Sequence, residues 1–276
     1  MAASGETPIA LTIAGSDSSG GAGIQADLKT FTALGVYGAS VITALTAQNT
    51  RGVGAIHAVP ASFVTQQIDA VATDLKVRAA KTGMLNDGDV VRAVAEGVRR
   101  HRLHPLVVDP VMIATSGDVL LQPDAIQAVR AELLPLAAVI TPNLPEAAHL
   151  LGCAIARDEA AMEVQARALL ELGPAAVLLK GGHGEGPEAV DILVQRDGAP
   201  IRLATARIDT ANTHGTGCTL SAAVTARLAL GDSLETAVRE AKRFVHAALI
   251  AGAMQKIGDG AGPLDHLHGL RKPLGN

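Results

Sequence analysis

Short apolar runs alternate with longer amphipathic segments along almost the whole chain. Runs such as residues 9–14 and 77–82 have the length and composition of buried strands. In segments such as residues 24–34, apolar side chains recur every three or four positions, which is the spacing of one helix face. Strands that alternate with helices form parallel sheets covered by those helices. We therefore predict an α/β fold of three layers, with a doubly wound, mainly parallel sheet and helices on both of its faces.

Turn and cap residues between these segments predict where each element lies. The predicted strands are residues 9–14, 39–45, 77–82, 106–109, 137–141 and 177–180, and the predicted helices are residues 24–34, 63–75, 90–103, 123–134, 145–151, 159–172, 218–230 and 234–254. Residues 189–194 and 201–206 flank Asp197-Gly198, a strong hairpin turn. We therefore expect antiparallel strands at one margin of the sheet.

The length and continuity of the chain favour one domain. Its 276 residues, 48% of them hydrophobic, are enough to bury one large core. The sequence contains no linker, repeat or low-complexity tract. We predict a single domain over residues 9–270, preceded by a flexible tail at residues 1–8.

Composition excludes several classes of protein. The net charge is −4, no basic block is present and aromatic residues make up 1% of the chain, so we expect no nucleic acid partner. The longest apolar stretches are far shorter than the roughly 18 residues of a membrane span, and the first residues do not resemble a signal peptide. Cys153 and Cys218 stand in unrelated contexts and imply no disulfide framework. We expect a cytoplasmic protein that does not bind membranes.

Glycine-rich and polar motifs follow several predicted strands, at the edge where doubly wound sheets bind ligands. The first, residues 15–23, either forms a plain tight turn or lets a ligand approach the backbone closely. Gly21, Gly23 and Ala26 also match the G-x-G-x-x-A fingerprint of dinucleotide-binding proteins. That fingerprint needs an acidic residue after the second strand, and residues 46–50 contain none. The missing acid disfavours a dinucleotide-dependent oxidoreductase.

Three further strand ends have side chains suited to phosphate chemistry. Asp109 follows the fourth strand, where it either orients Mg²⁺ or caps a turn. Asn143 and Glu146 follow the fifth strand, either beside a metal–phosphate cluster or as ordinary residues of a helix start. Lys180 ends the sixth strand before two glycines, and it either reaches a phosphate or extends along the surface.

Residues 212–219, with the sequence Asn-Thr-His-Gly-Thr-Gly-Cys-Thr, open a predicted helix. Gly215 and Gly217 expose N–H groups at the positive helix end, which predicts an anion hole for a transferring phosphoryl group. Cys218 lies in the first turn, where the same field favours a thiolate that accepts a proton from an attacking hydroxyl. The alternative for Cys218 is a buried structural cysteine. We predict ATP-dependent phosphorylation of a small-molecule hydroxyl. Since the chain has no G-x-x-x-x-G-K-[ST] P-loop, the reaction is expected at this helix end.

The order and spacing of the motifs are specific. The motifs are Ala14-Gly15-Ser16-Asp17, residues 20–30, Ala47-Gln48-Asn49-Thr50, Gly83-Met84-Leu85, Asp109-Pro110-Val111-Met112, residues 141–147, Lys180-Gly181-Gly182-His183 and residues 212–218. Over about residues 9–268 they resemble the hydroxymethylpyrimidine/phosphomethylpyrimidine kinases of thiamine biosynthesis, which belong to the ribokinase-like superfamily. The resemblance implies a homodimer that uses ATP and Mg²⁺. Its substrate is 4-amino-5-hydroxymethyl-2-methylpyrimidine, called HMP below, which is converted to the monophosphate and then to the diphosphate.

The resemblance also implies a role for each motif. The pyrimidine site is expected to contain Gly15, Asp27, Gln48, Met84 and Val111. The nucleotide is expected to contact Lys180, Asn143 and Thr213, and the Mg²⁺–phosphate region is expected to contain Asp109 and Glu146. The anion hole and catalytic residues are expected to be Gly215, Thr216, Gly217 and Cys218. Cys218 stands where most sugar kinases of the superfamily place an aspartate, and Ala211 stands where relatives often have a lysine.

Two other functions stay open. A pyridoxal or pyridoxine kinase shares the fold and the anion hole, although Gln48 and the motif around Gly15 and Asp27 favour the pyrimidine. A nucleotide-responsive regulator on a kinase scaffold is the second, although Cys218 between intact neighbours favours catalysis.

Histidines near the motifs have no assigned role. His183 and His214 are expected close to the ligands. His266 and His268 form an H-x-H, which is either a metal site or part of a solvated tail, and the absence of a third ligand nearby in the sequence favours the tail.

Overall fold

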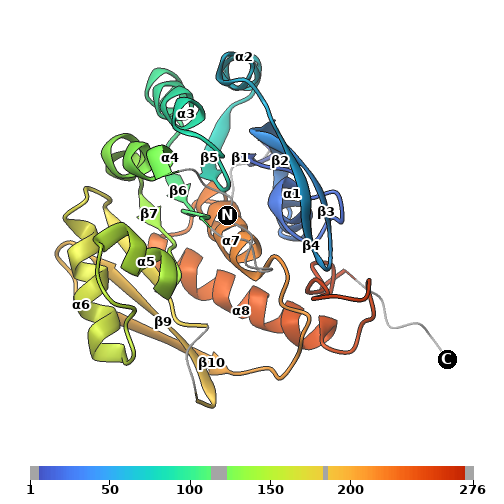
Figure 1. Ribbon diagram of the computed structural model, residues 1–276, viewed down its shortest axis with the longest axis vertical. Helices are drawn as coiled ribbons and strands as arrows, with labels where there is room; N and C mark the ends of the chain where they lie inside the picture. Colours follow the sequence, from blue (N-terminus) through green and yellow to red (C-terminus); the bar gives the residue numbers. More distant parts are fainter. Residues whose placement is uncertain (1–5, 113–122, 183–185, 271–276) are drawn as a thin grey trace.

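The computed structural model describes residues 6–112, 123–182 and 186–270, built around a mixed β-sheet (Figure 1). The strands of this sheet are β1 Ile9–Ala14, β2 Tyr37–Ile42, β5 Val77–Thr82, β6 Leu106–Val108, β7 Val139–Ile140, β8 Ala176–Lys180, β9 Glu188–Gln195 and β10 Ile201–Ala206. Within the described residues their order is β10-β9-β8-β7-β6-β5-β1-β2. Neighbours from β2 to β8 pair in parallel, and β9 pairs antiparallel with β8 and β10. The predicted parallel sheet with an antiparallel margin is confirmed.

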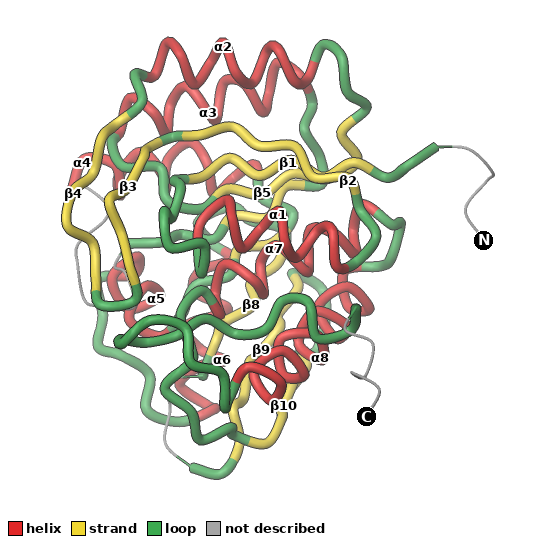
Figure 2. Tube along the Cα trace, turned by 90° about the vertical axis from the view of Figure 1, so that its right-hand side faces the viewer, coloured by secondary structure: helices red, strands yellow, loops and turns green. Residues whose placement is uncertain are grey.

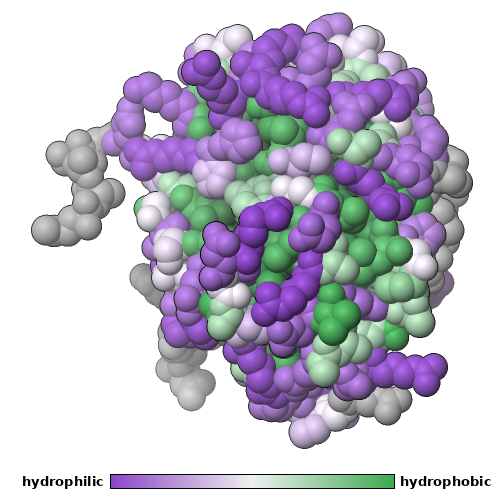
Figure 3. All heavy atoms as spheres, turned by 90° about the vertical axis from the view of Figure 1, so that its left-hand side faces the viewer, coloured by the Kyte–Doolittle hydropathy of each residue, from purple (hydrophilic) through white to green (hydrophobic). Residues whose placement is uncertain are grey.

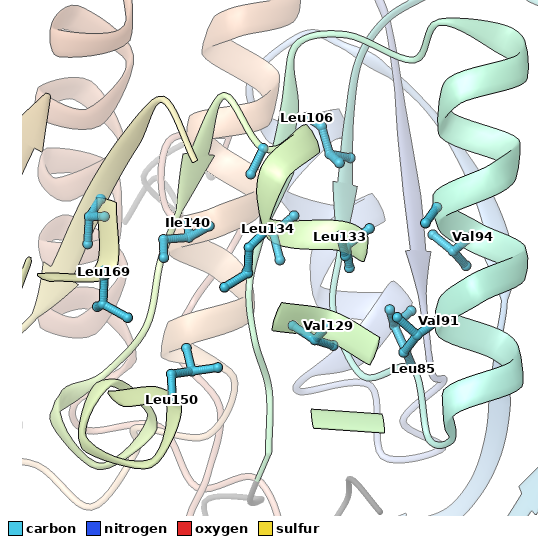
Figure 4. Close-up of a cluster of buried hydrophobic side chains, with 14 of the residues drawn as sticks. Leu85, Val91, Val94, Leu106, Val129, Leu133, Leu134, Ile140, Leu150 and Leu169 are labelled. Carbon is cyan, nitrogen blue, oxygen red and sulfur yellow. The ribbon is translucent and has the colours of Figure 1, made fainter. Parts of the chain in front are cut away.

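Helices cover both faces of the sheet. One layer consists of α2 Ala61–Ala72, α3 Gly88–His101, α4 Pro123–Ala128, α5 Leu144–Leu151 and α6 Glu159–Leu170, and the other of α1 Gly23–Ala33, α7 Thr216–Ala229 and α8 Leu234–Gly252. Alternate strand residues face opposite layers, because Leu106 belongs to the first core and Val107 to the second. In the first core, Leu106 and Ile140 lie near Leu133 and Leu134 (Figure 4). The predicted three-layer α/β fold is therefore confirmed.

The main difference from the predicted elements lies at residues 37–58. The strand predicted at residues 39–45 corresponds to β2, but its predicted end is wrong, because β2 ends at Ile42 and a separate hairpin follows. This hairpin consists of β3 Ala44–Asn49 and β4 Gly52–Ala58, which pair only with each other among the described strands (Figure 2). The β4 segment contains glycine and alanine at several positions, so it has no alternating hydrophobic pattern to reveal it. The N–H of Ser16 donates to the carbonyl of Ala44 at 2.9 Å, which places the hairpin beside the end of β1.

The helix predicted at residues 123–134 is regular only in its first half. After α4 ends at Ala128, the chain continues as a π-helical turn, Val129–Leu133, and then as a 3₁₀ turn, Leu134–Leu136. Pro135 has no N–H to donate to the preceding turn, which accounts for the end of the helix here.

The predicted tail at residues 1–8 is attached over part of its length. Residues 1–5 lie outside the described residues. Glu6 pairs with Lys76 at 2.6 Å and with Arg78 at 3.2 Å, and the carbonyl of Pro8 accepts from the N–H of Tyr37 at 2.9 Å. Residues 6–8 therefore contact the main sheet.

In the described part of the chain, no helix is long and apolar enough to cross a bilayer. The face shown in Figure 3 has hydrophobic patches separated by hydrophilic side chains.

The packing of α1 against the sheet predicts a difference between two phenylalanines. Phe31 is fully buried in the core beside α7, whereas Phe63 on α2 is 53% exposed. We expect Phe31→Ala to lower the free energy of unfolding by about 3–5 kcal/mol, because it leaves a cavity, and Phe63→Ala to lower it by less than about 1 kcal/mol. Urea denaturation of both variants measures this difference, and equal losses would contradict the described core.

Candidate active site

The carboxyl ends of five neighbouring strands meet at one edge of the sheet. The N–H of Gly15, after β1, donates to the carbonyl of Met84, after β5, at 3.1 Å. The N–H of Asp109, after β6, donates to the carbonyl of Thr82 at 3.1 Å, and the N–H of Lys180, at the end of β8, donates to the carbonyl of Pro142 at 2.9 Å. The parallel register therefore gathers motifs that are far apart in the sequence, as the sequence predicts.

Asp109 and Lys180 form a charged pair at the mouth of α7. One carboxylate oxygen of Asp109 accepts from Lys180 Nζ at 2.9 Å and from Thr141 Oγ1 at 3.0 Å, and the other accepts from Ser221 Oγ on α7 at 3.1 Å. A Cβ placed on Gly217 would lie 3.3 Å from Lys180 Nζ. Burial opposes the charge of Lys180, but the carboxylates of Asp109 and Glu146 outweigh it and raise the pKa of the lysine above its usual value. A permanent cation thus stands beside the first turn of α7.

The predicted anion hole lies at the first turn of α7. Gly215 precedes the helix with φ of 80°, and a Cβ on it would lie 1.9 Å from the carbonyl oxygen of Gly21, so only glycine fits. The helix begins at Thr216, whose hydroxyl donates to the carbonyl of Thr213 at 2.7 Å. The first N–H groups of a helix have no carbonyl partner inside it, and the helix dipole makes this end positive. The N–H groups of Gly217 and Cys218 stand at this end, next to Lys180.

Cys218 is half-buried, and its environment corrects the expected thiolate. The N–H of Gly23 donates to its sulfur. Burial, reinforced by the charges of Asp27 and Asp109, raises the pKa of the thiol to about 11, while Lys81 and the Gly23 N–H oppose this rise. The helix field alone predicts a lower pKa, but the loss of water and two nearby carboxylates dominate in the folded protein. Cys218 is therefore protonated near neutral pH.

Asp27 lies in a fully buried pair instead of an open pocket. One of its oxygens accepts from Lys81 Nζ at 2.8 Å and the other from Thr12 Oγ1 at 2.6 Å, and all three residues are 0% exposed. The carboxylate of Asp27, together with that of Asp109, outweighs burial and raises the pKa of Lys81. In this arrangement Asp27 supports the site from beneath. Lys81 was not among the residues predicted from the sequence, although a lysine inside the apolar run 77–82 is the signal that marks it.

The other expected pyrimidine residues surround the end of β1. A Cβ on Gly15 would lie 3.2 Å from the sulfur of Met84, so these two residues are in contact. Gln48 lies on β3, where its side-chain oxygen accepts from Thr46 Oγ1 at 3.1 Å and its N–H donates to Ser18 Oγ at 2.8 Å. The N–H of Val111 donates to the carbonyl of Asp109 at 2.8 Å. These residues therefore line the same edge as Asp109.

Asn143 and Glu146 form a capping box at the start of α5. The side chain of Asn143 accepts from the N–H of Glu146, and the side chain of Glu146 accepts from the N–H of Asn143, each at 2.8 Å. Burial raises the pKa of Glu146 to about 7, although the charge of Lys180 opposes the rise. Both residues therefore have a structural role, and Glu146 also interacts electrostatically with Lys180. Among the described residues, no group of three or more His, Cys, Asp or Glu could hold a metal ion by itself.

A buried pair joins the first glycine-rich loop to the anion hole. His214 Nε2 lies 2.8 Å from Asp17 Oδ2, and both residues are buried. Together with the close contact between Gly215 and Gly21, this pair shows that the loop after β1 and the start of α7 are neighbours. Neither Asp17 nor His214 has a role predicted from the sequence.

The other histidines differ from expectation. His183 lies outside the described residues. His266 is 4% exposed, its Nε2 lies 2.9 Å from Thr219 Oγ1, and burial lowers its pKa to about 4. His268 Nδ1 lies 3.0 Å from the carbonyl of Asp265. The predicted solvated tail is therefore wrong at His266, which packs against the first turn of α7.

Comparison with known proteins shows the family of this chain. The family model for phosphomethylpyrimidine kinase matches residues 17–265. The chain is 58% identical to the hydroxymethylpyrimidine/phosphomethylpyrimidine kinase of Rhizobium meliloti strain 1021, over 95% of this chain and 98% of the relative. It is 51% identical to the protein of the same name from Escherichia coli K12, over 94% of this chain and 97% of the relative.

Solved structures of related kinases share the fold. A Bacillus subtilis pyridoxal kinase in complex with ADP matches with a TM-score of 0.86 and 38% identity, over 95% of this chain and 98% of its own. A phosphomethylpyrimidine kinase from Clostridium difficile 630 matches with a TM-score of 0.77 and 46% identity, over 87% of this chain and 99% of its own. On the match over residues 17–265 and the identity to full-length relatives, this chain belongs to the phosphomethylpyrimidine kinase family.

Proposed function

We propose that the chain phosphorylates the hydroxymethyl group of HMP with ATP and then phosphorylates the monophosphate to the diphosphate, in thiamine biosynthesis. The observation that carries this proposal is the contact between the loop after β1 and the first turn of α7, where a Cβ on Gly215 would lie 1.9 Å from the oxygen of Gly21. This contact supports an acceptor site that lies beside the anion hole. Membership in the family, at 58% identity to one relative with this activity in its name, supports the choice of acceptor.

Phosphoryl transfer requires alignment and charge stabilisation more than covalent chemistry. The N–H groups of Gly217 and Cys218 stabilise negative charge as it develops on the moving phosphoryl group. Lys180 binds the nucleotide phosphates beside them, since its ammonium stands 3.3 Å from the Cβ position of Gly217. Thr213 and Asn143 complete the nucleotide side. A similar pyridoxal kinase of the same fold, whose structure is an ADP complex, supports the binding of a nucleotide.

The pyrimidine lies on the other side of the anion hole. Gln48 and the backbone near Gly15 hydrogen-bond to the ring edge, and Met84 and Val111 pack against its faces. Asp27 is buried with Lys81, so it acts through the charge and shape of the pocket floor. The substrate hydroxyl then points toward Cys218 and the first turn of α7.

Asp109 and Glu146 fit a Mg²⁺ ion that is held mainly by the nucleotide. Mg²⁺ prefers oxygen ligands, keeps several waters and takes one or two carboxylates together with substrate phosphates. Both carboxylates interact with the charge of Lys180, and Glu146, with its pKa of about 7, ionises readily when a cation approaches. When bound, the ion neutralises phosphate charge. Asp109 and Glu146 hold Lys180 in position whether or not the ion is bound.

We further propose a cytoplasmic homodimer. Leu45 and Ile56 on the β3–β4 hairpin are 47% and 38% exposed, which leaves apolar surface for a second copy. Analytical ultracentrifugation tests this, since a single species of monomer mass at micromolar concentration contradicts it.

A pyridoxal kinase is the second candidate, because the pyridoxal kinase of Bacillus subtilis shares the fold at a TM-score of 0.86. Its identity of 38% is lower than the 58% and 51% of the pyrimidine kinases. The two activities differ in product, because only the pyrimidine reaction proceeds to a diphosphate.

The reaction products distinguish the two candidate functions. Incubation with Mg-ATP and HMP should yield the monophosphate and then the diphosphate, both identified by mass spectrometry, with pyridoxal as the competing acceptor. Phosphorylation of pyridoxal without any HMP diphosphate would contradict the proposed function.

The two phosphorylation steps differ in their need for a proton acceptor. The acceptor is an alcohol in the first step and an already ionised phosphate in the second, so only the first benefits from the thiolate form of Cys218, which becomes more populated as the pH rises toward its pKa of about 11. Cys218→Ala should lower the single-turnover rate with HMP by about 100-fold, and the rate with HMP monophosphate by less than about tenfold. Equal losses in the two rates would refute this division.

The alkylation rate of the Cys218 thiol depends on its pKa. Because the pKa of Cys218 is about 11, its alkylation by iodoacetamide should keep accelerating above pH 9, with the exposed Cys153 as internal reference. Removal of the negative charge in Asp27→Asn should lower this pKa and speed alkylation at pH 9, whereas Lys81→Met should raise it and slow alkylation. Shifts in the same direction for both variants would show general unfolding of the pocket instead of an electrostatic effect.

A further inference from the structure

The carboxylate of Asp17 is the most heavily hydrogen-bonded acceptor at the active edge. It is 1% exposed and accepts from the N–H and hydroxyl of Ser19 at 2.8 and 2.7 Å, and from the N–H groups of Gly21 and Ala22 at 3.0 and 2.8 Å. These four bonds come from its own loop. The fifth comes from His214 Nε2 at 2.8 Å, 197 residues away in sequence. Burial alone raises the pKa of Asp17, but these donors, His214 first, hold it below its usual range.

His214 is held in place on several sides. A Cβ on Gly21 would lie 2.4 Å from the ring carbon Cδ2 of His214 and 3.2 Å from Cβ of Pro263, so the ring occupies the space that a side chain at position 21 would need. The N–H of His214 donates to the carbonyl of Gly262 at 3.0 Å. Since His214 directly precedes Gly215, its position fixes the start of the anion hole.

Few polar contacts join the loop at residues 15–23 to the start of α7. The close approach of Gly215 to Gly21 excludes side chains but contributes no hydrogen bond. The N–H of Gly23 reaches the sulfur of Cys218, which is a weak acceptor. The Asp17–His214 bond is thus the strong connection between the part of the site that holds the acceptor and the part that stabilises the phosphoryl group.

We propose that Asp17 and His214 are positioning residues that hold the loop at residues 15–23 in register with the first turn of α7, and so set the path over which the phosphoryl group moves. This inference rests on the proposed function, since it concerns transfer between the two sides of that site. Misplacement of reacting groups by about 1 Å is enough to cost about 100-fold in rate. Each substrate binds mainly to one of the two parts, so separation of the parts lowers kcat and leaves the two KM values nearly unchanged.

Two amide substitutions at position 214 test the bond itself. The amide nitrogen of glutamine is as many bonds from Cα as Nε2 of histidine, whereas that of asparagine is one bond shorter. His214→Gln therefore keeps a donor within reach of Asp17, and His214→Asn loses it at similar polarity and volume. We expect His214→Asn to lower kcat by about 100-fold, with both KM values within about threefold of wild type, and His214→Gln to retain a kcat at least about tenfold higher than His214→Asn.

A second histidine–aspartate pair serves as the matched control. His101 Nε2 on α3 lies 2.6 Å from Asp69 Oδ1 on α2, in the outer helix layer and outside the candidate site. His101→Asn removes a comparable bond, so it should lower the melting temperature without changing kcat by more than about twofold.

The measurements are kcat and KM for Mg-ATP and for the acceptor that the wild type phosphorylates, HMP or pyridoxal, together with thermal unfolding. Equal kcat values for His214→Gln and His214→Asn, or an effect confined to KM, would overturn the positioning role. A wild type that is active on pyridoxal alone overturns the proposed function and leaves this comparison intact. A wild type that is inactive on both acceptors overturns both.

Discussion

The close approach of the Gly215 backbone to that of Gly21 is the constraint on which the rest of the site depends. No Cβ fits at Gly215, where it would stand 1.9 Å from the Gly21 oxygen. This contact brings the positive end of α7 against the loop that follows β1, while α7 itself packs under the sheet beside α1 (Figures 1 and 2). The dipole of a long, buried helix is thereby aimed at one point on the carboxyl edge of the sheet. Lys180 and Asp109 reach the same point from β8 and β6.

Buried charges surround this point in pairs. The ion pairs Lys180–Asp109 and Lys81–Asp27 lie within the edge formed by β1, β5, β6 and β8 and the start of α7, and the hydrogen-bonded pair of His214 and Asp17 lies beside them. Buried ion pairs contribute little net stability, because desolvation offsets their attraction. Their concentration at one edge therefore indicates function. They fix the local potential so that the site meets a highly charged nucleotide without reorganisation, which is the main electrostatic contribution that proteins make to phosphoryl transfer.

Sequence patterns predicted most of the fold and failed for physical reasons where they failed. The alternation of strands and helices, and the Asp197-Gly198 turn between β9 and β10, are local signals, and the structure follows them. The β3–β4 hairpin was not predicted, because glycine and alanine in β4 leave no alternating hydrophobic pattern. The low pKa expected for the Cys218 thiol was based on the field of one helix. It could not include burial, or the charges of Asp27 and Asp109, which belong to other elements. His266 resembled part of a tail because its partner, Thr219, is 47 residues away.

By itself, the sequence determined the fold class, the family and which motifs lie at the strand ends, because periodicity and motif order are properties of neighbouring residues. The tertiary structure decided what those residues do to one another. It turned Asp27 from a presumed ligand contact into the partner of Lys81, kept Cys218 protonated, and made Asp17 and His214 a pair across 197 residues. Burial and the distance between charges set the properties of ionisable groups, and both exist only once the chain has folded.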